Sequence, residues 1–129
     1  MKTKKIFWAL AILLGAALVM QQLQAADGVD VKQAQSMTQQ GALLLDVREP
    51  EEFSAGHAPN AKLIPLGQLG SRLQEIAQYK DKPVVVMCRS GRRSGIAVNQ
   101  LQAAGFTQVS NVKGGIHEWE KNGLEIVKM

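Results

Sequence analysis

Two short runs of consecutive apolar residues most constrain what this chain can fold into. They are Ala42–Leu45 and Val84–Met87. A strand with one face in water alternates apolar and polar residues, whereas a strand covered on both faces can be apolar throughout. Consecutive valines also favour a strand, because β-branched side chains lose rotamer freedom in a helix. The two runs therefore predict buried strands of a parallel sheet.

Segments typical of helices alternate with the strands. Asp30 with Gln33 resembles a capping box that starts a helix, and Pro50 suits the first turn of another. We expect strands at Ala42–Val47, Ala61–Ile64, Val84–Met87 and Gln108–Val112. We expect helices from Asp30 to Gly41, from Pro50, over Ser71–Tyr79, from Arg92 or Arg93 to Ala104, and over Ile116–Lys121, with a turn at Gly56–Asn60. This order predicts an α/β domain with a mainly parallel sheet of about five strands, flanked by helices on both faces.

Residues 1–25 are expected to form a signal peptide. A short segment with three lysines precedes an uncharged, mostly apolar run from Ile6 to Met20, which is shorter than the roughly 20 residues of a membrane span. We expect cleavage near Ala25 or Ala26, which leaves residues 26–129 as one domain in the periplasm. The alternative is an uncleaved leader that anchors the protein in the inner membrane, and membrane contact is expected only in that case.

The formal net charge of +4 does not indicate a nucleic-acid partner. Three of the 15 basic residues lie in the leader, so 12 basic residues face 11 acidic ones in the predicted domain. A binder of nucleic acids usually carries a larger basic surface and aromatic residues that stack on bases. No long apolar helix face requires a partner either, so we expect a monomer.

Cys88 is the single cysteine, which excludes an internal disulfide and a cysteine-rich zinc site. His57 and His117 have no carboxylate at ligand spacing, so we expect no metal site. His57 is more simply a hydrogen-bonding residue of its turn.

Cys88 follows the valine run and begins a polar segment that leads into a helix. In parallel sheets, ligands bind at the carboxyl ends of strands. The free N–H groups and the dipole at a helix start favour a thiolate, and the arginines near Cys88 add positive charge. Gly91 lets the backbone curl so that N–H groups converge on an anion. The segment predicts a nucleophilic sulfur beneath an anion site; the alternative is a buried, inert cysteine before a solvated helix start.

Three motifs cover nearly all of residues 26–129. They are Leu45–Phe53 with Gly56–Ala61, Cys88–Arg93, and Asn111–Ile116 with Trp119. In this order they resemble the signatures of the single-domain rhodanese, or thiosulfate sulfurtransferase, family, whose active-site loop reads C-x-x-G-x-R. Asn60 stands where that family more often has Gly, and Ala58 where it has Ile or Val.

The resemblance implies a sulfurtransferase that works without a cofactor. The Cys88 thiolate would take the outer sulfur of thiosulfate, release sulfite, and hold a persulfide until cyanide or a thiol, including an exported thiol protein, accepts the sulfur. The implied anion cradle comprises Arg89, Ser90, Gly91, Arg92, Arg93 and Ser94. Arg93 occupies the last motif position, where its side chain could brace the loop instead.

Three supporting residues have two interpretations each. Asp46 and Arg48 either touch the site or pair with each other and order the loops, which the family resemblance favours. Trp119 either anchors the core or lines the pocket. Glu51 and Glu52 are interpreted as a solvated helix face.

The sequence disfavours one other function and leaves two alternatives open. Cysteine-dependent phosphatases use Cys-x5-Arg, which would need Arg at position 94, where this chain has Ser. A persulfide carrier without turnover and a redox-responsive thiol protein are further alternatives.

Overall fold

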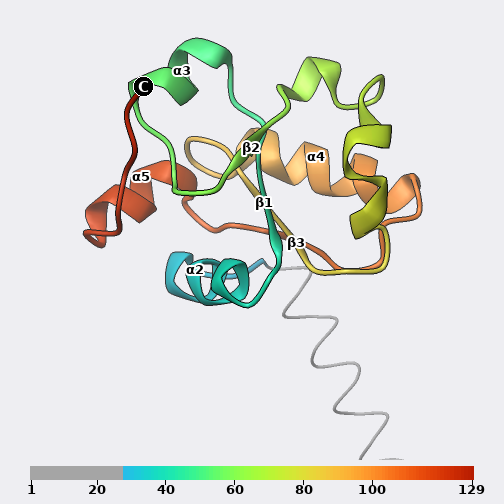
Figure 1. The fold of residues 1–129 in the computed structure, drawn as a ribbon, viewed down its shortest axis with the longest axis horizontal. Helices are drawn as coiled ribbons and strands as arrows, with labels where there is room; N and C mark the ends of the chain where they lie inside the picture. Colours follow the sequence, from blue (N-terminus) through green and yellow to red (C-terminus); the bar gives the residue numbers. More distant parts are fainter. Residues whose placement is uncertain (1–27) are drawn as a thin grey trace, which may run out of the picture.

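The computed structural model describes residues 28–129 (Figure 1). The predicted signal peptide, its cleavage site and the alternative membrane anchor lie outside these residues. No helix within them has the length and hydropathy needed to cross a membrane. The elements in chain order are α2 (Val31–Gln39), β1 (Leu43–Asp46), α3 (Pro50–Ala55), β2 (Lys62–Leu63), the 3-10 helices η1 (Leu66–Gln68) and η2 (Leu73–Tyr79), β3 (Val84–Met87), α4 (Arg92–Ala103), β4 (Val109–Asn111) and α5 (Gly115–Lys121).

The sheet contains four parallel strands in the order β2-β1-β3-β4. The predicted α/β class and parallel sheet are confirmed, but the expected count of about five strands is one too high. Val29 forms a single parallel bridge with Val112 beyond β4. The pairing does not continue past Val29, because Asp30 caps α2 at the next residue.

Both faces of the sheet are covered, as the continuous apolar runs predicted. Successive residues of a strand point to opposite faces. Leu45 and Val86 pack in the cluster that contains α4 and η2, whereas Leu44 and Val85 pack in the cluster that contains α2 and α5. Figure 1 shows α2 and α5 on one side of β1 and β3, with α4 on the other. Every residue of β1 and β3 is therefore buried.

Of two local predictions, the capping box of α2 is confirmed and the type of helix over Ser71–Tyr79 is wrong. The capping box at α2 is confirmed, since Asp30 Oδ1 accepts from the Gln33 N–H at 2.8 Å and Gln33 Oε1 accepts from the Asp30 N–H at 3.0 Å. The segment predicted as a helix over Ser71–Tyr79 instead forms the 3-10 helix η2. Its apolar residues Leu73, Ile76 and Tyr79 recur every third position, and three residues per turn place all of them against the core.

The turn after α3 explains one departure from the family signature. Asn60 has φ of 65°, in the left-handed region that Gly enters freely and Asn enters more readily than most residues. Ala58 is fully buried. His57 stacks on Phe53 with ring centroids 3.8 Å apart, and its Nδ1 lies 2.9 Å from the Phe53 carbonyl oxygen. The turn is therefore closed by packing and hydrogen bonds.

Candidate active site

Cys88 lies at the carboxyl end of β3, between the ends of β1 and β4. The residue is 1% exposed and directly follows the last strand residue, Met87. Only three residues separate it from the first residue of α4, Arg92. The turn is this tight because Gly91 adopts φ of +109° as the N-cap, a conformation that other residues rarely enter. The predicted order of strand, loop and helix is thus present.

Hydrogen-bond donors converge on the Cys88 sulfur. The Gly91 N–H lies 3.1 Å from Sγ, and the Ser94 hydroxyl oxygen lies 3.3 Å from it. Burial raises the pKa of the Cys88 thiol, but hydrogen bonds from the Ser94 hydroxyl and from the N–H groups of Ser94, Gly91 and Ser90 outweigh burial and leave this pKa lowered. The loop therefore favours the thiolate, the nucleophilic form of cysteine.

Asn111, the last residue of β4, connects to both of these sulfur contacts. Its Oδ1 lies 2.6 Å from Ser94 Oγ, and its Nδ2 donates to the Gly91 carbonyl at 2.9 Å. Sequence reasoning placed Asn111 in a motif but did not include it among the site residues. Its position at the end of a strand beside β3, where ligand-binding side chains gather, was the available signal.

The start of α5 holds the first two carbonyls of the loop. The Ile116 N–H donates to the Cys88 carbonyl at 2.8 Å, and the His117 N–H donates to the Arg89 carbonyl at 3.1 Å. The start of α5 can lie this close to the loop only with glycine at position 115, because a Cβ there would collide with the Cys88 carbonyl oxygen. The closing motif thus supports the active-site loop through its backbone.

Trp119 lies in the core cluster on the α2 side of the sheet, whereas Cys88 belongs to the cluster on the α4 side. It is 2% exposed, and its indole N–H donates to the Glu125 carbonyl at 2.8 Å. The structure therefore places Trp119 as a core anchor.

The three arginines of the loop have different surroundings. Arg93 forms two hydrogen bonds to the Glu52 carboxylate, at 2.6 and 2.8 Å. The interpretation of Glu52 as part of a solvated face is wrong, because this contact joins α3 to α4. The hydrogen bond from Arg93 lowers the pKa of Glu52 from 4.5 to about 2. Arg89 and Arg92 are exposed, and neither forms an ion pair within the described part of the chain.

Asp46 and Arg48 pair with each other and are almost fully buried. Arg48 Nη2 lies 2.8 Å from Asp46 Oδ2, with side-chain exposures of 5% and 0%. The same nitrogen donates to the Gly56 carbonyl at 2.8 Å. The pair therefore orders the segment between β1 and the end of α3, and among residues 28–129 no hydrogen bond joins it to Cys88.

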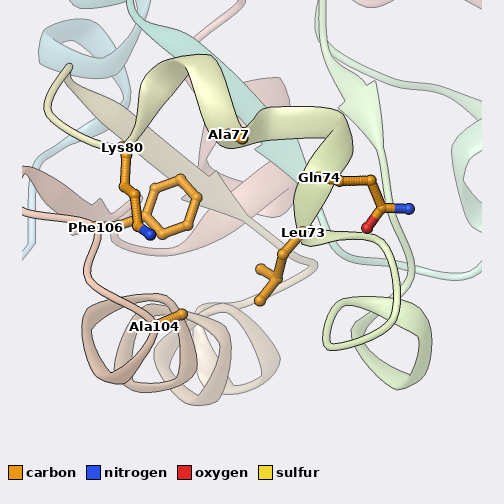
Figure 2. A pocket seen from close by; sticks show the side chains of 6 residues that line it. All are labelled: Leu73, Gln74, Ala77, Lys80, Ala104 and Phe106. Atoms are coloured by element: carbon orange, nitrogen blue, oxygen red, sulfur yellow. The ribbon is translucent and has the colours of Figure 1, made fainter.

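A hollow of about 230 Å³ lies at the opposite end of the sheet. It is lined by Leu73, Gln74, Ala77, Lys80, Ala104 and Phe106. Figure 2 shows Phe106 and Lys80 on one side of it and Leu73 and Gln74 on the other. Lys80 and Phe106 precede the amino ends of β3 and β4, whereas Cys88 follows the carboxyl end of β3. The hollow is therefore separate from the cysteine. No cluster of three or more metal-ligating side chains occurs within residues 28–129.

Comparisons with known proteins agree on one family. The family model described as a rhodanese-like domain matches residues 30–122. An uncharacterized Bacillus subtilis protein, YqhL, is 47% identical over 78 residues, and the match covers 60% of each chain. A sulfurtransferase from Allochromatium vinosum is 42% identical over 85 residues, covering 66% of this chain and 78% of that protein.

The fold is also similar to a solved rhodanese-related structure. The crystal structure of a rhodanese-related protein from Thermoplasma volcanium matches with a TM-score of 0.71 and 29% identity, covering 79% of this chain and 98% of that one. The family match extends across the Cys88 loop, the Asp46–Arg48 pair and the Asn111 contacts described above. The chain therefore belongs to the family of rhodanese-like domains, and this membership links it to sulfur transfer.

Proposed function

We propose that the protein is a sulfurtransferase that moves sulfane sulfur from thiosulfate, or a related donor, to cyanide or a thiol through a persulfide on Cys88. One observation carries the proposal: the sulfur of the only cysteine lies where the Gly91 N–H and the Ser94 hydroxyl converge, and the pKa of its thiol is lowered. Such a site stabilises negative charge on sulfur, both on the thiolate and on the terminal atom of a persulfide.

The proposed reaction has two displacement steps. The Cys88 thiolate attacks the outer sulfur of thiosulfate, a new S–S bond forms, and sulfite leaves with the electron pair of the bond that breaks. The persulfide anion keeps the remaining charge. Cyanide or a thiolate then attacks the outer sulfur of the persulfide, so that thiocyanate or a new persulfide leaves and the Cys88 thiolate returns. Neither step needs an external oxidant or a metal, and both are thiol-exchange chemistry.

The three arginines of the loop have different roles in this proposal. Arg89 and Arg92 are exposed and without an ion pair among the described residues, so their charge is available to attract a dianion. Arg93 is committed to Glu52, and its role is to hold the start of α4 under the anion. The Ser94 hydroxyl oxygen lies 3.3 Å from the sulfur, and Ser94 stands at the position where a phosphatase loop would have arginine. This difference supports transfer of a single sulfur over phosphate chemistry.

The predicted signal peptide extends the proposal to the periplasm. The acceptor there would be a small thiol or an exported thiol protein, and we propose a monomer that uses no cofactor. An anchored form at the inner membrane is the alternative.

Intact mass spectrometry of the purified protein tests the proposal. Treatment with thiosulfate should add the mass of one sulfur atom, and cyanide should remove it. The Cys88→Ser variant, which cannot form a persulfide, should gain nothing. A parent protein that stays at its original mass, although Cys88 reacts with an alkylating reagent, would exclude thiosulfate as donor and favour a carrier that receives its sulfur from another protein.

A further inference from the structure

The side chain of Asn111 forms hydrogen bonds with Gly91 and Ser94, two of the residues that donate to the Cys88 sulfur, without a hydrogen bond of its own to that sulfur. Its Nδ2 donates to the Gly91 carbonyl, and its Oδ1 lies against the Ser94 hydroxyl. The orientation of the amide follows from chemistry, since a backbone carbonyl only accepts hydrogen bonds and so requires the NH2 group. The amide oxygen is thereby directed at Ser94.

The Ser94 hydroxyl has one proton and two acceptors within reach. These are Asn111 Oδ1, 2.6 Å from Ser94 Oγ, and Cys88 Sγ, 3.3 Å from it. A hydroxyl donates only one hydrogen bond at a time but can also accept. The proton must therefore point either to the asparagine or to the sulfur.

We propose that Asn111 is a positioning residue that holds the Ser94 proton while Cys88 is neutral and releases it to the sulfur when the sulfur carries negative charge. While Cys88 is neutral, its S–H donates to Ser94 Oγ, and the Ser94 O–H donates to Asn111 Oδ1. When Cys88 ionises, or carries a persulfide anion, the Ser94 O–H turns to sulfur and Asn111 Oδ1 loses its donor. Asn111 thus competes with the thiolate for one proton, which moderates the charge stabilisation that Ser94 supplies.

The hydrogen-bond chain through Ser94 is enclosed by protein. Ser94 is fully buried, so water does not replace either partner freely. The charged and titratable groups around Cys88 come from several neighbouring segments. They are Asp46 at the end of β1, Arg48 two residues later, Glu52 on α3, Arg89 in the loop before α4, Arg92 and Arg93 at the start of α4, and His117 on α5. None of these is altered in the variants below, so differences among the variants report on Asn111 and Ser94.

The test is the pH dependence of alkylation of Cys88 by iodoacetamide, which needs no sulfur donor. Cys88 is the only cysteine, so the signal comes from one site. The Ser94→Ala variant should move the midpoint up by about one pH unit, because the thiolate loses a donor. The Asn111→Leu variant should move it down by up to about one pH unit, because Ser94 then donates to sulfur without competition.

The decisive measurement is the Ser94→Ala/Asn111→Leu double variant. If Asn111 acts through Ser94, the alkylation midpoint of the double variant equals that of Ser94→Ala alone. Two results would overturn the inference and assign Asn111 to the support of Gly91 alone. One is a change in the midpoint when Asn111→Leu is added to Ser94→Ala. The other is a midpoint that rises when Asn111→Leu is introduced into the parent protein. Asn111→Asp keeps an oxygen acceptor beside Ser94 and replaces Asn111→Leu in the test if the leucine variant does not fold. Asn111→Asp should raise the alkylation midpoint more in the parent background than in the Ser94→Ala background.

Asn122→Leu is the matched control, because Asn122 is exposed and, within residues 28–129, its side chain forms hydrogen bonds only with Glu118. Its midpoint should equal that of the parent. The inference rests on the proposed function only where it assigns the hydrogen-bond switch a role in sulfur transfer. A shift in the alkylation midpoint without thiosulfate turnover would retain the hydrogen-bond switch and reject the proposed donor, so the two failures are distinguishable.

Discussion

The segment after β1 and the loop after β3 both carry arginines at the same edge of the sheet, but they use them in opposite ways. Arg48 is buried, pairs with Asp46 and donates to a backbone carbonyl, so its hydrogen-bonding capacity is spent inside the fold. Arg89 and Arg92 are exposed and have no ion pair among residues 28–129. Arg93 is intermediate, at 33% side-chain exposure, and it joins the two regions through Glu52. The comparison separates an arginine that builds the site from arginines that can serve a ligand.

The largest expected effect is on the buried pair. Arg48→Ala leaves the Asp46 carboxylate buried without its partner, which should destabilise the protein by about 3–5 kcal/mol. Urea unfolding followed by circular dichroism measures this change. An Asp46→Asn/Arg48→Met double variant should recover part of the loss, because no unpaired charge remains. A single variant as stable as the parent would show that Asp46 is not enclosed as described.

A smaller effect is expected at the half-buried contact between the two regions. Glu52→Gln should lower the free energy of unfolding by less than about 1 kcal/mol, because solvent screens a pair that is one-third exposed. The same urea titration measures it, beside Lys121→Gln as a control for a more exposed pair, in which the Lys121 and Glu118 side chains are 71% and 39% exposed. A loss as large as that of Arg48→Ala would contradict the proposed ranking of the two regions.

Acid should remove the contribution of the Glu52 pair. The pKa of Glu52 is lowered from 4.5 to about 2 in the folded protein, so folding favours its ionised form. The contribution is fully present above pH 4.5 and is lost as pH falls through about 2. The difference in unfolding free energy between the parent and Glu52→Gln should therefore shrink across this window. A difference that grows on acidification would reverse the sign of the linkage.

The smallest effect on stability is expected at the exposed arginines. Arg89→Ala and Arg92→Ala should each change the free energy of unfolding by less than about 0.5 kcal/mol. Each should nevertheless slow persulfide formation from thiosulfate several-fold at low salt and weaken its dependence on ionic strength. Lys82→Ala, which removes the same charge before the amino end of β3, is the control. Equal rates in all three variants would leave the two arginines without a role in attracting the donor.

Much of the fold could be predicted from the sequence, because its signals are local. The capping box at Asp30 and the uninterrupted valines of β3 act within a few residues of one another. The number of strands was harder to predict, since the pairing of Val29 with Val112 joins residues that are 83 positions apart in the sequence. The 3-10 form of η2 also depends on the core against which its residues pack.

The sequence by itself determined the order of strand, Cys88, glycine turn and helix, because adjacent residues and their backbone conformations produce it. Only the tertiary structure decided which side chains complete the site. Ser94 and Asn111 are 17 residues apart, and Glu52 and Arg93 are 41 apart. Their contacts exist because parallel strands bring their carboxyl ends to one edge of the sheet, where segments distant in sequence become neighbours.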